Sequence, residues 1–178
     1  MSSPDNRSSS FSSKTIDTRT KKLATAAILA TLALIFSYLE SLIPLSFTIP
    51  GVKLGIANLV ILIALYKLDF KYALAINLVR ILVSGLLFSG VFGIIYSFAG
   101  GLLSLLVMWL LKSTNLFSIV GVSMAGGVAH NIGQLLVASL IVSDFRMFIY
   151  MPILMFSGLI SGIVLGYVCY YILNRSLS

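Results

Sequence analysis

The sequence contains few charged residues for its length. Only 10% of its 178 residues are Asp, Glu, Lys or Arg, and 59% are hydrophobic, whereas a soluble domain has about 25% charged residues. From Leu23 to Leu173 the chain is almost continuously apolar, and most of its charges fall at short breaks between apolar runs. No soluble core of this size can hide so much apolar surface. The scarcity of charge predicts an all-α, multi-pass protein of the cell membrane.

Other absences exclude several chemistries. The single cysteine, Cys169, cannot form an internal disulfide or a thiolate metal cluster. No two of the five acidic residues lie within one helix turn, so no carboxylate cluster is available to hold magnesium. The chain also lacks a glycine-rich phosphate loop followed by Lys-Ser or Lys-Thr. We therefore expect no catalytic residue, no metal site, no cofactor and no nucleotide hydrolysis.

The first 20 residues differ from the rest of the chain. They are rich in Ser and Thr and have almost no apolar side chain except Phe11 and Ile16, so they cannot bury enough surface to offset the entropy of ordering. We expect residues 1–20 to form a disordered cytoplasmic tail. Arg19, Lys21 and Lys22 then lead into a full-length apolar span, which indicates a retained span rather than a signal peptide. Residues 21–178 are expected to form one six-helix transmembrane domain.

Six apolar runs approach or exceed the length needed to cross a membrane, which is about 20 residues with a lower limit near 17. Short polar, proline-containing or glycine-containing breaks separate them, such as the charged segment 67–71 and the polar segment 143–146. The second run is the shortest. The runs predict transmembrane helices at residues 23–44, 52–67, 72–88, 91–111, 116–142 and 147–173.

The distribution of Lys and Arg predicts the orientation of these helices. Six spans with a cytoplasmic N-terminus place both termini in the cytoplasm. Only Lys53 and Arg146 then fall on the outer side, in agreement with the positive-inside rule. Topology and attraction to anionic membrane lipids explain the net charge of +7 without nucleic acid. The cations of the inner side are Arg7, Lys14, Arg19, Lys21, Lys22, Lys67, Lys71, Lys112 and Arg175.

A small set of polar side chains lies within the spans. A charge within hydrocarbon is unfavourable by roughly 2.5–3.5 kcal/mol on insertion scales, so these residues are candidates for function. Asn77 and Arg80 share one helix face, and His130 and Gln134 share another. If these faces converge, they form a polar pocket that suits a carboxylate or phosphate, which Arg binds bidentately. The predicted substrate-binding residues are Lys53, Asn58, Asn77, Arg80, His130, Asn131 and Gln134.

Structural roles are equally open for the same residues. Arg80 can pair with Glu40 and hold two helices together, and Lys53 can extend to the lipid headgroups. The polar residues at positions 130, 131 and 134 can form a hydrogen-bond network between helices without any ligand. One histidine and one carboxylate within the spans cannot complete a metal coordination sphere.

Small residues recur at intervals of four in two spans. Ala26 and Ala30 give the first span a face that another backbone can approach closely, which suits either internal packing or docking of a partner membrane protein. Gly158, Gly162 and Gly166 form a longer ridge in the sixth span, and for this ridge we expect internal packing.

Three segments carry a family resemblance. They are Pro50-Gly51-Val52-Lys53-Leu54-Gly55-Ile56-Ala57-Asn58-Leu59, then Asn77-Leu78-Val79-Arg80, and finally Gly126-Gly127-Val128-Ala129-His130-Asn131-Ile132-Gly133-Gln134. With them the chain, from roughly Lys21 to its C-terminus, resembles the Gx transporter family, which is also labelled heptaprenyl diphosphate synthase component I. It is similar overall to the substrate-binding membrane subunits of energy-coupling-factor transporters.

The transporter resemblance implies a six-helix subunit that binds a small nutrient, such as a vitamin or its precursor, near its outer face. It also implies docking, through Ala26 and Ala30, onto a separate membrane scaffold driven by two cytoplasmic ATPases. Catalysis by this chain is not expected, because prenyl elongation needs magnesium held by clustered carboxylates. Two other functions stay open, namely an accessory subunit of prenyl diphosphate or quinone metabolism and a membrane assembly protein without a ligand.

Overall fold

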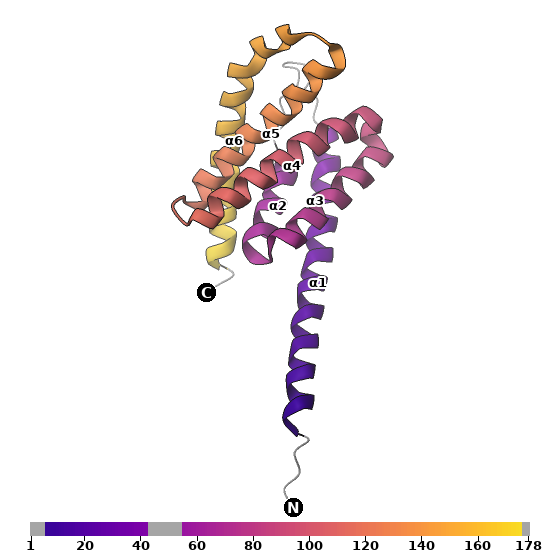
Figure 1. The fold of residues 1–178 in the computed structure, drawn as a ribbon, viewed down its shortest axis with the longest axis vertical. Coiled ribbons are helices and arrows are strands. Elements are labelled where there is room, and N and C mark those ends of the chain that lie inside the picture. Colours follow the sequence, from indigo (N-terminus) through magenta and orange to yellow (C-terminus); the bar gives the residue numbers. More distant parts are fainter. Residues whose placement is uncertain (1–5, 43–54, 176–178) are drawn as a thin grey trace, which may run out of the picture.

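The chain is helical wherever its structure is described (Figure 1). The fold comes from a computed structural model, which describes residues 6–42 and 55–175 and side chains from residue 18 onward. The all-α prediction is confirmed for these residues, whereas Lys53 and the predicted start of the second span lie outside them. The elements are α1 (Asn6–Leu42), α2 (Ile56–Lys67), α3 (Phe70–Ser84), the π-helical segment η2 (Gly85–Ser89), α4 (Gly90–Thr114), α5 (Ile119–Val142), the 3-10 segment η3 (Phe145–Tyr150) and α6 (Met151–Arg175).

Helix α2 is the buried centre of the bundle. It contacts α1, α3, α4 and α6, and eight of its 12 residues are buried. The sequence explains this position, because Asn58 is the only polar residue between Ile56 and Leu65 and a helix that is apolar on all sides is buried on all sides. Its 12 residues span about 18 Å, which is well short of the ~30 Å of a hydrocarbon core.

Helices α4, α5 and α6 pack through glycine. A Cβ atom added to Gly162 of α6 would lie 2.5 Å from the Cα of Met124 and 2.8 Å from the carbonyl oxygen of Ser123, both in α5. Gly158 and Gly166 meet the α5 backbone in the same way, one turn to either side. The expected internal packing of this glycine ridge is therefore confirmed, and it brings α5 and α6 into backbone contact.

Helices α3 and α4 form an antiparallel pair, although the helical segments between Phe70 and Thr114 follow one another without a gap. The reversal occurs through η2 and Gly90, whose φ of 69° suits glycine. A Cβ atom on Gly101 would lie 3.1 Å from Nδ2 of Asn77. In a straight helix the 24 intervening steps would place these residues about 36 Å apart. The predicted break near residue 89 is therefore a tight turn between two helices.

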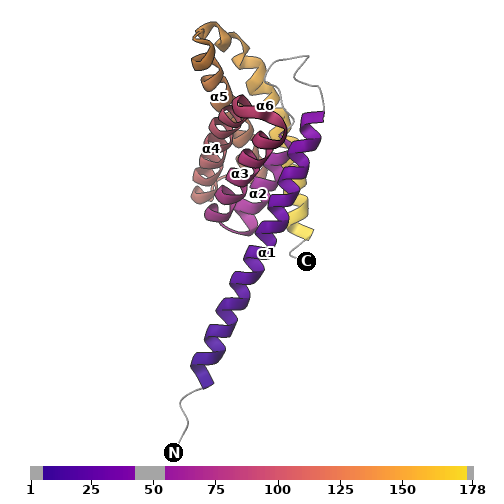
Figure 2. The same ribbon diagram turned by 90° about the vertical axis from the view of Figure 1, so that its right-hand side faces the viewer.

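Helix α1 begins at Asn6, before the predicted start of the first span. The structure continues this helix through residues 6–20, and the disordered cytoplasmic tail over residues 1–20 stays a prediction. Extending an existing helix adds one hydrogen bond per ordered residue, whereas starting a new helix is unfavourable. Figure 2 shows that this first part of α1 projects beyond the bundle.

The described helices fit a multi-pass membrane protein. By length and composition, four runs can cross a membrane, and α2 is a shorter apolar helix. One of these runs contains both α3 and α4 and reverses within itself. The observed helix ends lie within a few residues of most predicted span boundaries. The four runs are Thr18–Leu42, Phe70–Thr114, Ile119–Val142 and Phe145–Arg175.

The end of the bundle at which the chain terminates also holds the α2–α3 and α4–α5 turns (Figure 1). There Lys22 of α1 forms an exposed ion pair of 3.1 Å with Asp69, a type of contact worth about 0–1 kcal/mol. Lys112 of α4 donates a hydrogen bond of 2.6 Å to the carbonyl oxygen of Leu65, and its Nζ lies 4.9 Å from the ring centroid of Tyr66. Lys112 therefore satisfies one of the carbonyl groups that the end of α2 leaves without a helical partner.

The glycine contacts predict a position-specific effect of one added methyl group. Gly162→Ala should lower stability by roughly 1–3 kcal/mol, because the new Cβ meets the α5 backbone, which cannot move aside as a flexible side chain can. Gly121→Ala is the matched control, since a Cβ at that position would come no nearer than 3.6 Å to another atom. Thermal unfolding of both variants in detergent is the measurement. Equal melting temperatures would contradict the backbone contact between α5 and α6.

Candidate functional site

Arg80 is a buried cation in the middle of the bundle. It lies on α3 with only 8% of its surface exposed, and Asn77, one turn earlier, is 1% exposed. Nη2 of Arg80 donates a hydrogen bond of 2.9 Å to Oδ1 of Asn77. The spacing of three residues brings the two side chains together on one helix face, as the sequence predicts.

Both side chains retain hydrogen-bond donors without a partner among the described residues. These donors are Nε of Arg80 and Nδ2 of Asn77. In the same part of the chain, no carboxylate oxygen lies within 4.0 Å of the guanidinium. A buried donor without an acceptor is unfavourable by about 1–3 kcal/mol, and more when it is charged. The two side chains can therefore donate hydrogen bonds to one more acceptor, preferably an anionic one.

Glu40 has another partner in this structure. Its Oε1 accepts a hydrogen bond of 2.6 Å from the backbone N–H of Gly55, the N-cap residue of α2. The Glu40 charge acts on Arg80 at longer range, without a direct ion pair within 4.0 Å. The alternative that Arg80 simply pairs with Glu40 is therefore not what the structure contains. Glu40 instead connects the end of α1 to the start of α2.

A second polar group lines a small cavity among α2, α4, α5 and α6. Asn58, His130 and Asn131 contribute to its wall. Its volume is about 20 Å³, which is enough for one water molecule and far below the ~300–1,000 Å³ of a small-molecule pocket. Nδ2 of Asn131 donates a hydrogen bond of 2.6 Å to the carbonyl oxygen of Leu154 in α6. For Asn131, the alternative of an interhelical hydrogen bond is thus borne out.

Two adjacent glycines of α4 face different polar residues. Gly101 faces α3, since its Cβ position lies 3.1 Å from Asn77, whereas the Cβ position of Gly100 lies 2.8 Å from Cγ of Gln134 and 3.1 Å from Cε1 of His130. The predicted binding residues therefore do not form one cluster around α4. Asn77 and Arg80 make one group, His130 and Gln134 lie against Gly100, and Asn58 and Asn131 line the cavity together with His130. The position of Lys53 relative to them lies outside the described residues.

Three serines of the cavity were missed by the sequence analysis. Ser104, Ser123 and Ser161 come from α4, α5 and α6 and line the cavity together with the polar residues of α2 and α5. The Oγ atom of Ser104 is buried and has no hydrogen-bond partner among the described residues. The sequence feature that could have indicated them is a serine hydroxyl within each of three apolar runs. Serine is common in membrane helices, however, and only the packing shows that these three face one space.

The alanine pair of α1 lies on an internal face. Ala26 is buried and Ala30 is partly buried, and both pack with the core around α2. This is the internal packing that the sequence left open. Docking of a partner through Ala26 and Ala30 stays a prediction, and Ala27 and Thr31 are the exposed small residues beside them.

The fold and the buried polar residues define a class, that of small helical membrane proteins with a polar interior. Comparison with known families places the chain more closely. The family described as heptaprenyl diphosphate synthase component I matches residues 29–172, so the chain belongs to this family, as its resemblance indicated. Searches of curated proteins and of solved structures gave no match.

The Asn131 contact predicts a modest loss of stability on truncation. Asn131→Ala removes the hydrogen bond to the Leu154 carbonyl, and hydrogen bonds of this kind within membranes are worth about 0.6 kcal/mol on average and up to ~1.7 kcal/mol. Asn174→Ala, at the exposed end of α6, is the control. Thermal unfolding in detergent measures both. A melting temperature for Asn131→Ala equal to that of the control would contradict a stabilising bond between α5 and α6.

Proposed function

We propose that this chain is the substrate-binding membrane subunit of an energy-coupling-factor-type transporter and takes up a small anionic, vitamin-like nutrient. The observation that carries the proposal is the buried Arg80, which has an unpartnered Nε donor and no carboxylate within 4.0 Å among the described residues. An uncompensated buried cation is strongly unfavourable, so a protein retains it where an anion neutralises it for part of the working cycle.

Arg80 would hold the ligand, and Asn77 would orient it. A guanidinium presents a planar fork that matches a carboxylate or phosphate bidentately. The hydrogen bond from Nη2 to Asn77 fixes one edge of this fork, and Nδ2 of Asn77 lies beside it as an additional donor. The resulting recognition is for an anionic group rather than for a neutral polar one.

The cavity among α2, α4, α5 and α6 would receive a different part of the ligand. Asn58 and His130 can exchange hydrogen bonds with polar substituents there, and Lys53 remains a proposed contact at the outer mouth. In the present conformation this cavity has room for only one water molecule, so binding requires the helices around α4 to move apart. Helix packing through glycine, without bulky interlocking side chains, suits such a movement.

Membrane topology supports an outward-facing site. We infer six spans with both termini in the cytoplasm, in which α3 and α4 count separately and the chain enters α2 from the outer side. The charged turns near Asp69 and Lys112 then face the cytoplasm together with Arg175, and Arg146 faces outward. Arg80 would lie within the third span.

Transport would require other proteins, because the chain has no phosphate-binding loop of its own. The resemblance to energy-coupling-factor substrate subunits supports a separate membrane scaffold and two ATPases as partners. Ala26 and Ala30 remain the proposed docking pair, although they also pack internally. Docking would then involve the exposed residues beside this pair.

A second candidate function is favoured by the family description. A component of heptaprenyl diphosphate synthase would hold an anionic diphosphate with an apolar tail, and the same Arg80 chemistry would serve it. The chain would then act as a non-catalytic accessory, since the sequence lacks an acidic cluster for magnesium. Product formation from prenyl diphosphates by the purified chain would instead favour a synthase role.

The site predicts that Arg80→Gln removes ligand binding without unfolding the protein. Loss of a buried charge pair is worth roughly 2–5 kcal/mol, so an anionic compound that co-purifies with the wild type should be lost from this variant. Arg80→Lys should restore binding only in part, because an ammonium lacks the planar fork. Mass spectrometry of the small molecules released from each purified protein is the measurement. Lys71→Gln, which removes one exposed charge of the same sign, is the control.

Thermal stability separates this function from a structural role of Arg80. If the cation mainly serves to balance Glu40, Arg80→Gln should lower the melting temperature of the ligand-free protein, and Glu40→Gln in addition should restore it. A stable Arg80→Gln protein with wild-type ligand content would remove Arg80 from the binding site.

The topology predicts the accessibility of two turns. In a Cys169→Ala background, a cysteine at Ser143, in the exposed α5–α6 turn, should react with an impermeant thiol reagent added to intact cells. A cysteine at Ser113, near the end of α4, should react only after the membrane is opened. The reverse pattern of labelling would invert the orientation and place the Arg80 site on the cytoplasmic side.

A further inference from the structure

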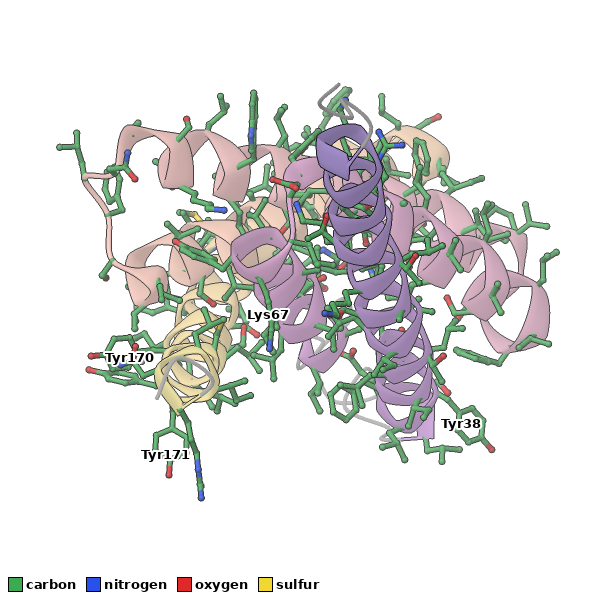
Figure 3. The ribbon with its side chains drawn as sticks, turned by 90° about the horizontal axis from the view of Figure 1, so that it is seen from below. Tyr38, Lys67, Tyr170 and Tyr171 are labelled. Atoms are coloured by element: carbon green, nitrogen blue, oxygen red, sulfur yellow. The ribbon has the colours of Figure 1, made fainter. Side chains whose placement is uncertain are left out.

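A groove lies at the cation-rich end of the bundle. It is not part of the proposed substrate site. It has a volume of about 650 Å³ and lies where the α4–α5 turn meets α6 and the end of α2. The residues that matter for its chemistry are Tyr66, Lys112, Asn115, Ser118, Tyr167 and Tyr170. Figure 3, which views the bundle from below, shows Tyr170 and Tyr171 extending outward from α6.

The polar part of this groove contains a cation, Lys112, and the start of a helix. Lys112 is half-buried and uses one hydrogen bond on the carbonyl oxygen of Leu65, whereas an ammonium has three donors. The first turn of α5 adds the positive end of a 24-residue helix, with Ser118 as its N-cap accepting from the N–H of Gly121 at 3.2 Å. None of the described residues that line this groove is acidic, in contrast to the groove on the other side of Lys112, which contains Asp69.

The rest of the groove is aromatic and open to the surroundings of the bundle. Tyr167 and Tyr170 lie one turn apart on α6 and are 62% and 50% exposed. Their rings combine an apolar body with a polar hydroxyl, which is the character of residues at a membrane–water interface. Exposed Ile163 and Val164 continue the apolar surface of α6 away from this end. A free phosphate ion would use only the cationic part, whereas a phospholipid would use both parts.

We propose that this groove binds the phosphate headgroup of an anionic phospholipid of the cytoplasmic leaflet. Lys112 and Asn115 contact the phosphate, the start of α5 supplies a favourable field, and the tyrosines of α6 cover the glycerol region while an acyl chain follows the apolar side of α6. The occupied groove holds α4, α5 and α6 together at the end where Lys112 also caps α2. The inference rests on the proposed membrane topology but not on the identity of the transported ligand.

The test compares the full-length protein in nanodiscs of phosphatidylcholine with and without phosphatidylglycerol. Phosphatidylglycerol should raise the melting temperature of the wild type, and native mass spectrometry should find it retained. Ser118→Asp should lose most of this increase and bind phosphatidylglycerol roughly fivefold more weakly, since one charge at a membrane surface changes binding by about this factor. Asp is as good an N-cap as Ser, so α5 keeps its start while the groove gains a repelling carboxylate.

Two further variants make the outcome decisive. Lys112→Gln should lose the same lipid-dependent increase, and Lys67→Gln, which removes a charge at the same end but does not line the groove, should keep it. If both Ser118→Asp and Lys112→Gln respond to phosphatidylglycerol as the wild type does, the groove is not a lipid site. An equal increase on adding inorganic phosphate to phosphatidylcholine nanodiscs would also overturn the proposal, because it would assign the site to a free anion.

Discussion

Polar groups inside this bundle have no solvent to bind, and the structure depends on how each of them is satisfied. Three polar or charged side chains bond to a backbone group of a different helix or of its cap. Asn131 donates to the Leu154 carbonyl, Lys112 donates to the Leu65 carbonyl, and Glu40 accepts from the N–H of Gly55. Such bonds fix where one helix lies along another, which apolar packing alone does not. The Arg80–Asn77 pair differs because it bonds only within its own helix.

Helix α4 lies beside both the Arg80–Asn77 pair and the second set of polar residues. Its adjacent glycines face different neighbours, with Gly101 against Asn77 and Gly100 against His130 and Gln134. Because neither position carries a side chain, both sets of polar residues lie close to the α4 backbone. A displacement of α4 therefore changes the surroundings of both sets together.

The sequence predicts much of the helical framework because apolar runs and their breaks are local features. The pairing of Asn77 with Arg80 is also local, since it follows from a spacing of three. Convergence of the remaining polar residues is not local, because it depends on how closely α4, α5 and α6 approach through glycines distant in sequence. The three serines of the cavity could not be predicted from the sequence either, because their convergence depends on the same helix packing. Composition alone does not predict that α1 includes residues 6–20, because the helix there continues from the apolar span that follows.

The short α2 bears on how the charge of Arg80 can be neutralised. A helix of 12 residues leaves N–H groups at its start and C=O groups at its end without helical partners. Glu40 places a carboxylate at its N-terminal end and Lys112 places an ammonium at its C-terminal end, each with the sign that the helix dipole favours. Oε1 of Glu40 is bonded to the start of α2 at 2.6 Å, so moving this side chain to Arg80 would leave the N–H of Gly55 without this acceptor. In the structure the carboxylate lies at the start of α2 and not within 4.0 Å of Arg80. The positive charge of Arg80 is thereby left available, and a bound anion can neutralise it without disturbing the central helix.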